Sequence, residues 1–360
     1  MIVGGGPAGS AAAIALARAG HEVTLIERTA SASDKVCGDF VSAEAITAIT
    51  DCGVDLSALA PAPIGHVRLI HGKRIATARL PFAAFGLTRR ALDEALLRHA
   101  SDCGATVLRG HQVKGIHVDG SPHSIDCASL GPLESPAVFL ATGKHNLRGT
   151  PRRARSSGLI GLKMYYALAP GQAAILRGNV ELMLFAGGYA GLQPVEGGHA
   201  VLCALLPASR LRSLETLASE NPHLAMRLAG ARPLLRRPLA IAGLSYGYVH
   251  AGCRDEPPGL FRLGDQAAVI PSLTGDGVAL ALASGTLAAR TWLEGGNATL
   301  YHSRHAANLA QQMRLACVIH RLCLSPGAQR VVVAAGQLWP SAVRLIANWT
   351  RSATISVQGV

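Results

Sequence analysis

The sequence is poor in aromatic residues and in lysine, and it has no long uninterrupted apolar run. Aromatic side chains make up 4% of the 360 residues, and only five residues are lysines. Proteins that recognise nucleic acids usually combine basic runs with aromatic stacking platforms, so we expect no nucleic-acid partner. No apolar stretch reaches the roughly 20 residues that a transmembrane helix needs, so we expect no transmembrane segment.

Paired cysteines are also lacking, because none of the eight forms a Cys-x-x-Cys motif: Cys37, Cys52, Cys103, Cys127, Cys203, Cys253, Cys317 and Cys323. The chain opens on a glycine-rich turn rather than on a signal peptide, which predicts a cytoplasmic protein with free thiols. Cys317, His320 and Cys323 point in divergent directions on their predicted helix. We therefore expect no metal site.

Acidic residues are fewer than basic residues, and this excess of basic residues gives a formal net charge of +12 and an isoelectric point near 9.8. This excess predicts either a solvated, arginine-rich surface or attraction for anionic partners such as phosphates, acyl-carrier proteins or anionic lipid. A carrier-bound substrate and peripheral membrane contact both remain open. The 40 glycines and the 49% of hydrophobic residues suit close packing of helices on a sheet.

Periodicity predicts an order of elements along the chain. Strands are expected at 21–28, 105–110, 136–143 and 260–264, and an antiparallel sheet over 157–205. Helices are expected at 9–20, 88–103, 276–293, 299–325 and 338–350. Segments typical of a dinucleotide-binding fold therefore occur at the start, near 85–143 and near 260–293, and a sheet-rich region separates them.

The opening turn contains the spacing G-x-G-x-x-G at Gly4, Gly6 and Gly9, between a strand and a helix. The first glycine permits a tight turn, the second lets the backbone approach a pyrophosphate, and the third lets the helix pack closely on the strand. Glu27 ends the next strand, where an acidic side chain holds ribose hydroxyls. Only three residues precede Gly4, so we expect a very short first strand or a natural start upstream of Met1.

Two further segments accompany this turn. Residues 261–265 end a strand on a Gly-Asp pair, and 271–277 (Pro-Ser-Leu-Thr-Gly-Asp-Gly) lead into a small-residue helix. With the Thr-Arg-Arg-Ala-Leu-Asp segment around Arg89 and the Lys-Val-Cys-Gly segment at 35–38, the chain resembles the FAD-dependent superfamily of group A flavoprotein monooxygenases, flavin halogenases and geranylgeranyl reductases. The resemblance implies an α/β fold. It comprises a Rossmann-like FAD-binding domain of the glutathione-reductase type, an inserted antiparallel-sheet substrate domain and a helical C-terminus.

The resemblance also implies domain boundaries and FAD-binding residues. The FAD-binding domain is expected to be discontinuous, at 1–60, 86–150 and 255–295, with a substrate domain at 61–85 and 151–254 and a helical region at 296–360. The expected FAD-binding residues are Gly4, Gly6, Pro7, Ala8, Gly9, Glu27, Arg28, Cys37, Gly38, Arg89, Gly264, Asp265, Thr274, Gly275, Asp276 and Gly277.

Two segments depart from the family pattern. Where the hydroxylases carry an Asp-Gly motif that touches the nicotinamide cofactor, this chain has Thr142 before the glycine, so NAD(P)H and a partner reductase both stay open as electron donor. Where the reductases carry Tyr-x-Trp-x-Phe-Pro, this chain keeps Tyr189 but has Gly191 and Gln193 in place of the large aromatics. This change predicts a bulkier or more polar substrate. The halogenases' Trp-x-Trp-x-Ile-Pro motif is absent, which argues against halogenation.

These observations predict an FAD-dependent oxidoreductase that acts on a small hydrophobic or aromatic substrate. The first hypothesis is a monooxygenase that hydroxylates an aromatic or polyketide-like compound in a dry pocket. The second is a flavin-dependent reductase of C=C bonds, and the third is a non-catalytic FAD-binding redox partner. Candidate catalytic residues are Cys37, His145, Tyr189 and Gln193, and each has packing or surface exposure as its alternative explanation.

Overall fold

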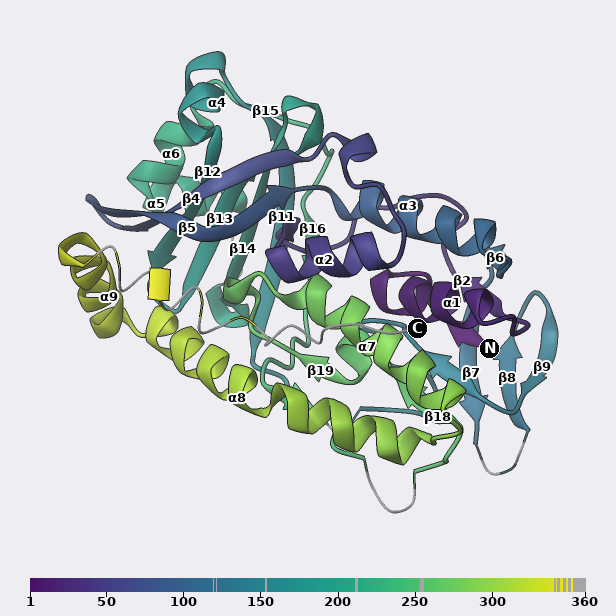
Figure 1. Cartoon of the computed structure of the whole chain (residues 1–360). Coiled ribbons are helices and arrows are strands. Elements are labelled where there is room, and N and C mark those ends of the chain that lie inside the picture. Colours follow the sequence, from purple (N-terminus) through teal and green to yellow (C-terminus); the bar gives the residue numbers. More distant parts are fainter. Residues whose placement is uncertain are drawn as a thin grey trace.

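The structure of the protein is a computed structural model (Figure 1). It describes residues 1–118, 120, 122–152, 154–210, 213–252, 256–339, 341, 344–345, 348 and 351. Cys253 lies outside the described residues, as does much of the helix expected at 338–350. Among the described residues, no helix is both long and apolar enough to cross a membrane.

A five-stranded parallel sheet forms one half of the molecule, in the order β18-β10-β1-β2-β6. Its strands are β1 (Ile2–Val3), β2 (Thr24–Glu27), β6 (Thr106–Arg109), β10 (Val138–Leu140) and β18 (Leu260–Arg262). Helices α1 (Pro7–Arg18), α3 (Arg89–Asp102) and α7 (Gly277–Leu293) pack beside it. Strand, helix and parallel strand in this order form the expected Rossmann-like unit.

Small residues allow α1 and α7 to approach closely. A Cβ atom added at Gly285 of α7 would lie 2.1 Å from the carbonyl oxygen of Ala8, so only glycine fits at this crossing. Ala8, Ala11 and Ala12 are buried in the same core. The alanine- and glycine-rich composition of both helices therefore follows from their contact.

A nine-stranded sheet forms the other half, with the main order β15-β11-β14-β13-β12-β4-β5-β3 and with β16 paired to β11. Its strands are β3 (Phe40–Val41), β4 (Ala62–His71), β5 (Arg74–Gly86), β11 (Leu159–Ala167), β12 (Gly178–Phe185), β13 (Gly188–Pro194), β14 (Ala200–Pro207), β15 (Arg232–Pro233) and β16 (Leu239–Ile241). All pairs in it are antiparallel except β12 with β4. The antiparallel sheet expected over 157–205 is thus confirmed, and β4 and β5 extend it.

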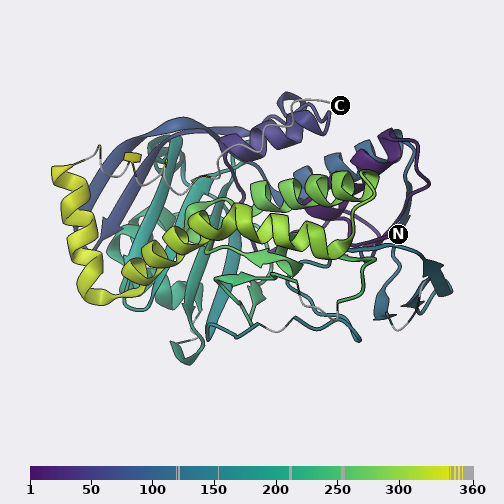
Figure 2. The same ribbon diagram turned by 60° about the horizontal axis from the view of Figure 1, so that its bottom comes forward.

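Helices cover both faces of this sheet (Figures 1 and 2). One face packs on α4 (Pro170–Leu176), α5 (Leu214–Glu220) and α6 (Pro222–Leu228). The opposite face packs on the C-terminal part of α8 (Ala298–Leu324) and on α9 (Pro326–Leu338). Helix α8 runs from the parallel sheet to the nine-stranded sheet and so connects the two halves (Figure 2).

Three features differ from the expectations. Residues 113–135 form a separate three-stranded sheet of β7 (Val113–His117), β8 (His123–Cys127) and β9 (Gly131–Ser135), which the sequence did not predict because its strands are short and rich in polar residues. Helix α9 begins at Pro326, whereas the next helix after 325 was expected only at 338. Proline is well suited to the first turn of a helix, and this signal was missed. Short strands β17 (Tyr248–Val249) and β19 (Ala268–Val269) pair with each other, and α2 (Ala43–Asp51) follows β3.

Candidate functional site

The glycine turn leaves the N-terminus of α1 open. Gly4 has φ +107°, and a Cβ atom there would lie 2.4 Å from the carbonyl oxygen of Ala141. Gly6 is the N-cap of α1 and provides no capping side chain, and the first turn contains no acidic residue. The free N–H groups and the positive end of the helix dipole can therefore accept the phosphates of a dinucleotide.

Glu27 lies at the end of β2 and is almost fully buried. Its carboxylate accepts hydrogen bonds from the Gly5 amide (2.8 Å) and from the Thr29 amide (3.0 Å) and hydroxyl (2.7 Å). Burial alone would raise the pKa of Glu27, but these hydrogen bonds outweigh it and lower the pKa. The side chain is thus held ionised beside a small cavity, which Gly5, Glu27, Lys35, Leu97 and Arg109 help to line. Ribose hydroxyls fit such a carboxylate.

Arg89 lies at the start of α3 and close to the glycine turn. Its guanidinium forms a bidentate ion pair with Asp93, at 2.7 and 2.9 Å. One nitrogen of the guanidinium would lie 3.4 Å from a Cβ atom at Gly6. Arg89 therefore places a guanidinium group, paired with Asp93, beside the glycine turn.

Asp265 follows β18, after Gly264, which has φ +55°. The Asp265 backbone carbonyl accepts a hydrogen bond from Arg152 (2.8 Å), and Lys144 Nζ lies 3.9 Å from its carboxylate. Arg152 also binds the carbonyl of Lys144 at 2.8 Å. The carboxylate itself remains partly exposed, so it can accept hydrogen bonds from a ribitol chain.

His145 lies in the segment after β10, next to Lys144, and it is partly exposed. Its ring nitrogen Nε2 lies 3.1 Å from the guanidinium of Arg28. Burial, and then the positive charge of Arg28, lower the pKa of His145. The structure thus gives His145 a role in a surface contact between the segments after β2 and β10, and no contact to the nine-stranded sheet is described for it.

The turn at 271–277 leads into α7. Gly275 has φ +75°, and a Cβ atom there would lie 2.6 Å from the ring of Phe40. Asp276 is buried at the N-cap, where its carboxylate binds Gln312 (3.2 Å) and the Arg351 guanidinium. Burial raises the pKa of Asp276 to about 7. The turn thus touches the segment at 35–40 through Gly275 and Phe40.

One face of the nine-stranded sheet points toward these two segments, and we call it the site face. Cross-strand pairing of Lys163 with Cys203, and of Cys203 with Gly191, puts these three residues on this face. Gly191 and Cys203 are only half-buried, and a Cβ atom at Gly191 would find its nearest neighbour, Leu182 Cδ2, at 3.5 Å. The site face therefore has an accessible apolar floor at its centre, where the family's large aromatics are absent.

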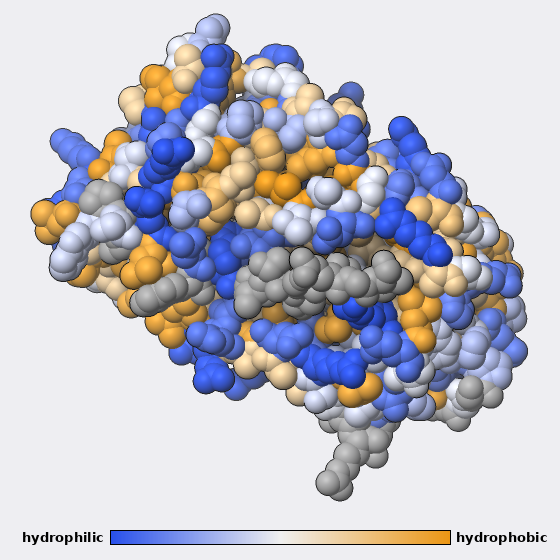
Figure 3. Space-filling view, viewed as in Figure 1, coloured by the Kyte–Doolittle hydropathy of each residue, from blue (hydrophilic) through white to orange (hydrophobic). Residues whose placement is uncertain are grey.

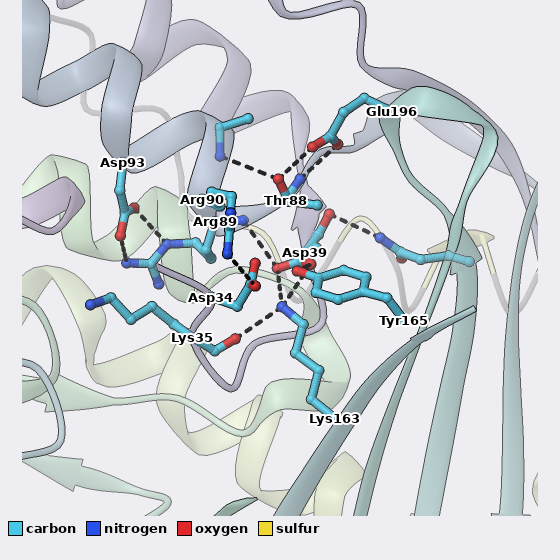
Figure 4. A network of polar contacts seen from close by, with 12 residues as sticks. Asp34, Lys35, Asp39, Thr88, Arg89, Arg90, Asp93, Lys163, Tyr165 and Glu196 are labelled. Carbon is cyan, nitrogen blue, oxygen red and sulfur yellow. Dashed lines mark hydrogen bonds and ion pairs between the residues drawn. The ribbon is translucent and has the colours of Figure 1, made fainter. Parts of the chain in front are cut away.

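Polar groups on the site face converge on Asp39 (Figure 4). Lys163 Nζ donates hydrogen bonds to the Asp39 carboxylate (2.8 Å) and to the carbonyl of Lys35 (2.9 Å). The Tyr165 hydroxyl donates to the same carboxylate at 2.6 Å, and Gln193 donates to the Asp39 carbonyl at 2.9 Å. Asp39 has φ +57°, a backbone conformation that is uncommon outside glycine and often occurs at functional sites.

The Asp39 cluster is buried, since Asp39 and Lys163 are at most 1% exposed. Burial raises the pKa of Asp39, although the Lys163 ammonium and the Tyr165 hydroxyl act in the opposite direction. Burial and the adjacent Asp39 charge raise the pKa of Tyr165. The cluster thus holds two hydrogen-bond donors, the Lys163 ammonium and the Tyr165 hydroxyl, against one carboxylate in a buried place.

Sequence reasoning missed Asp39, Lys163 and Tyr165. A signal was available, because Lys163 is the one charged residue in the strand sequence LIGLKMYYA. The pairing with Asp39 could not be foreseen, since the two residues lie 124 positions apart.

Tyr189 and Gln193 both lie on the site face, whereas Cys37 packs against the hydrophobic core of the parallel-sheet half. The Tyr189 hydroxyl is 2.7 Å from Ser272 Oγ, so β13 is tied to the 271–277 turn. Tyr246 donates to the same serine at 3.0 Å. The structure therefore brings Gln193 into contact with the Asp39 cluster, ties Tyr189 to the 271–277 turn on the same face of the sheet, and leaves His145 outside this group.

One histidine and carboxylate cluster has the composition of a metal site. Ligand atoms of His250, Glu256 and His302 lie within 4.8 Å of one another. However, the Arg262 amide donates to His302 Nε2 (3.0 Å), and the Arg262 guanidinium binds Glu256 (3.0 Å). The first bond leaves the proton of neutral His302 on Nδ1, toward Glu256, and the second places a positive charge where a cation would lie. The arrangement is that of an ion cluster.

Comparison with known proteins relates the N-terminal third of the chain to FAD-binding domains. Residues 1–126 match the family described as FAD binding domain. Over 97% of this chain and 91% of the relative, the sequence is 26% identical to the menaquinone reductase of Mycolicibacterium smegmatis. A flavin-dependent halogenase of Armillaria mellea, armH1, is 34% identical over 32% of this chain and 24% of its own length.

Solved structures share the fold over nearly the whole chain. The halogenase PltM superimposes with a TM-score of 0.78 at 12% identity, over 97% of this chain and 81% of its own. A geranylgeranyl bacteriochlorophyll reductase-like protein from Thermoplasma acidophilum gives a TM-score of 0.72 at 18% identity, over 93% and 90%. The α/β fold class and the family resemblance are both confirmed.

Proposed function

We propose that this chain, an FAD-dependent oxidoreductase of the superfamily that includes group A monooxygenases and geranylgeranyl reductases, reduces a C=C bond or quinone ring of an apolar, isoprenoid-quinone-like substrate. The observation that carries this proposal is the buried Asp39, Lys163 and Tyr165 cluster beside the accessible apolar floor of the site face. Similarity to the menaquinone reductases along almost the full length of both proteins supports it.

The proposed FAD site follows the contacts described above. Gly4, Gly6 and Gly9 with the start of α1 would hold the pyrophosphate, and Glu27 would hold the adenosine ribose. Asp265 would bind the ribitol chain, and the start of α7 would lie near the flavin ring, where a helix dipole stabilises negative charge by up to about 2 kcal/mol. The open turn and the absence of a Cβ at Gly4 and Gly6 fit such a cofactor. On this proposal, the parallel-sheet half and the nine-stranded half correspond to the cofactor and substrate domains.

The bound flavin would supply a hydride to one carbon or oxygen of the acceptor, and the acceptor then needs a proton to complete the reduction. On this proposal, Lys163 or Tyr165 donates that proton, since both are hydrogen-bonded to Asp39 on the site face. The buried ammonium of Lys163 would also stabilise negative charge that develops on the acceptor. The residues around Gly191 would hold the apolar part of the substrate away from water.

A second candidate is the monooxygenase of an aromatic or polyketide-like substrate. The observation that favours it is that Gly191 and the amide of Gln193 stand on the site face where large aromatics occur in the family's reductases, so the lining there is less bulky and less apolar. In either case the electron donor is NAD(P)H or a partner reductase. The absence of an Asp-Gly motif at Thr142 favours the partner reductase.

The two candidates differ in their need for oxygen. The protein would be loaded with FAD, reduced anaerobically with light, and mixed with menaquinone or with a panel of aromatic compounds. Rapid reoxidation of the flavin by the quinone without oxygen, with a reduced product by mass spectrometry, would support the reductase. Product formation only after admission of oxygen would support the monooxygenase. If none of the substrates changes the rate at which the flavin is reoxidised, both enzymatic candidates fail, and the role of a redox partner is the one that stands.

A further inference from the structure

One end of the molecule exposes apolar side chains on adjacent elements. Leu338 is 84% exposed, Trp339 71% and Val331 67%, which are the largest values among the exposed large hydrophobics of the described chain. Val331 and Leu338 are two turns apart and share one face of α9. Val318 and Leu322 are exposed on α8, one turn apart and on a common face.

The β4–β5 hairpin adjoins this end. Gln337 of α9 donates a hydrogen bond to the carbonyl of Ile75 (3.1 Å), which places the hairpin tip beside α9. Ile75 is itself exposed, and the neighbouring Lys73 and Arg74 are exposed as well. We call the surface of the hairpin tip (72–75), the exposed side of α9 and the C-terminal part of α8 the basic apolar end. In Figure 3, hydrophobic and hydrophilic side chains alternate over this end of the molecule, around α9.

The charge of this end has a single sign. The sequence contains no Asp or Glu after Glu294, and none between Asp55 and Asp93, so neither contributing segment carries an acidic residue. The first of these stretches has six arginines, and four of them lie at or near the exposed apolar residues: Arg314, Arg321, Arg330 and Arg344. All four are exposed. The partner that fits this surface must therefore be apolar and anionic.

We propose that the basic apolar end docks on the surface of an anionic lipid bilayer. Amphipathic surfaces rich in arginine or lysine, with tryptophan and leucine on the apolar side, lie in the membrane interface and bind more strongly as anionic lipid increases. The finding that no described helix can span a bilayer is compatible with this, since docking needs only partial insertion. The surface is defined by exposure and charge alone, and it does not depend on which reaction the FAD site performs.

The experiment uses the full chain and sedimentation with two kinds of vesicle, phosphatidylcholine alone and phosphatidylcholine with phosphatidylglycerol. The protein should bind the second kind at least tenfold more strongly, and high salt should release it. Val331→Ser/Leu338→Ser/Trp339→Ser should abolish binding to both. The matched control Ile175→Ser/Met226→Ser removes exposed apolar residues elsewhere and should bind as the wild type does.

The charge contribution is tested by Arg321→Gln/Arg330→Gln, which should weaken binding to the anionic vesicles by about tenfold or more. Its control, Arg236→Gln/Arg237→Gln, removes the same charge from exposed positions outside the basic apolar end and should have little effect. If both double variants lost vesicle binding equally, the proposal would be overturned, because net charge alone would then explain binding. The proposal would also be overturned if the triple variant kept its vesicle binding, or if it changed only the oligomeric state in gel filtration.

Discussion

Glu181 and Asp39 are both fully buried carboxylates, and they lie against opposite faces of the same nine-stranded sheet. Glu181 binds two guanidinium groups, of Arg68 (2.9 Å) and Arg227 (2.9 Å), and also His223 (2.8 Å). Burial acts to raise its pKa, but these three partners lower it to about 2. Asp39 has one ammonium and one phenol, and there burial raises the pKa.

The difference separates a structural anchor from a group that can change its protonation. A carboxylate between two guanidinium groups stays ionised over the whole physiological range, because arginine does not release its proton. A carboxylate that shares its site with a lysine and a tyrosine has partners that can both exchange protons. The same buried residue type therefore serves packing on the α6 side of the sheet and, on our proposal, chemistry on the site face.

The largest expected effect is on turnover. Lys163→Met removes the ammonium at Asp39, and we expect the proposed reduction to slow by about 10²–10⁴-fold, as for loss of a general acid. Rapid-mixing measurement of flavin reoxidation by the substrate, at equal FAD content, checks this. Arg68→Met removes a cation from the Glu181 cluster and should leave the rate of the folded enzyme unchanged. Similar losses in both variants would remove the distinction between the two clusters.

The next effect is on stability. Glu181→Ala leaves the buried Arg227 and the half-buried Arg68 without a counter-ion, and breaking a buried ion cluster in this way costs about 3–5 kcal/mol of unfolding free energy. Asp39→Asn should cost less, because it leaves one ammonium, that of Lys163, without a counter-ion instead of two guanidinium groups, and the amide oxygen still accepts a hydrogen bond. Urea unfolding of both variants provides the comparison. If Asp39→Asn is the more destabilising, Asp39 is the main anchor and our assignment is reversed.

The two carboxylates should also give stability a pH dependence of opposite sign. Because the folded-state pKa of Glu181 is lowered from 4.5 to about 2, its contribution is complete above about pH 4.5 and is lost as the pH falls toward 2. The contribution is up to about 3 kcal/mol. For Asp39, whose pKa is raised, protonation favours the folded state, so its contribution declines as the pH rises. In the Glu181→Gln variant, the free energy of unfolding should therefore fall less steeply between pH 4.5 and 2 than in the wild type, as measured by urea unfolding. If the variant and the wild type lose stability equally in this pH range, Glu181 does not have the lowered pKa that we assign to it.

The comparison also shows what sequence could predict. The glycine turn before α1, the position of Glu27 at the end of β2 and the turn before α7 were predictable as local structure, because each depends on glycines and acidic residues at short, fixed spacings. The parallel sheet followed from strand, helix and strand in order. Tyr189 and Gln193 were singled out from a family motif, and they lie on one face of β13, but their catalytic role stays a prediction.

The Asp39 cluster was not predictable, because it joins β11 to the loop before β3 across 124 residues. Cross-strand register decides that Lys163 shares a face with Gly191, and register depends on which strands pair and how they are aligned. The same applies to Glu181, which no local pattern distinguishes from a surface residue. Charged residues inside apolar strands are the signal that could direct a future search to such clusters.

A smaller effect is expected from filling the floor of the site face. Gly191→Trp restores a large aromatic where the family's reductases carry one, and it should lower turnover of bulky substrates by about tenfold to a hundredfold. Gly191→Ala adds one methyl group that meets only ordinary contacts, and it should change turnover little. FAD content, measured from the visible spectrum, should stay constant in both variants. Full activity of Gly191→Trp with a long isoprenoid quinone would place the substrate elsewhere.

The smallest effect is expected where an ion pair is exposed instead of buried. Arg304 and Glu294 are 3.2 Å apart, and their side chains are 46% and 51% exposed. Water already solvates both charges, so their coupling should be below about 1 kcal/mol and should decrease further in salt. A double-mutant cycle with Arg304→Ala and Glu294→Ala in urea unfolding measures it. A coupling as large as the effect at Glu181 would mean that desolvation does not set the strength of these clusters, and the contrast between Glu181 and Asp39 would then need another cause.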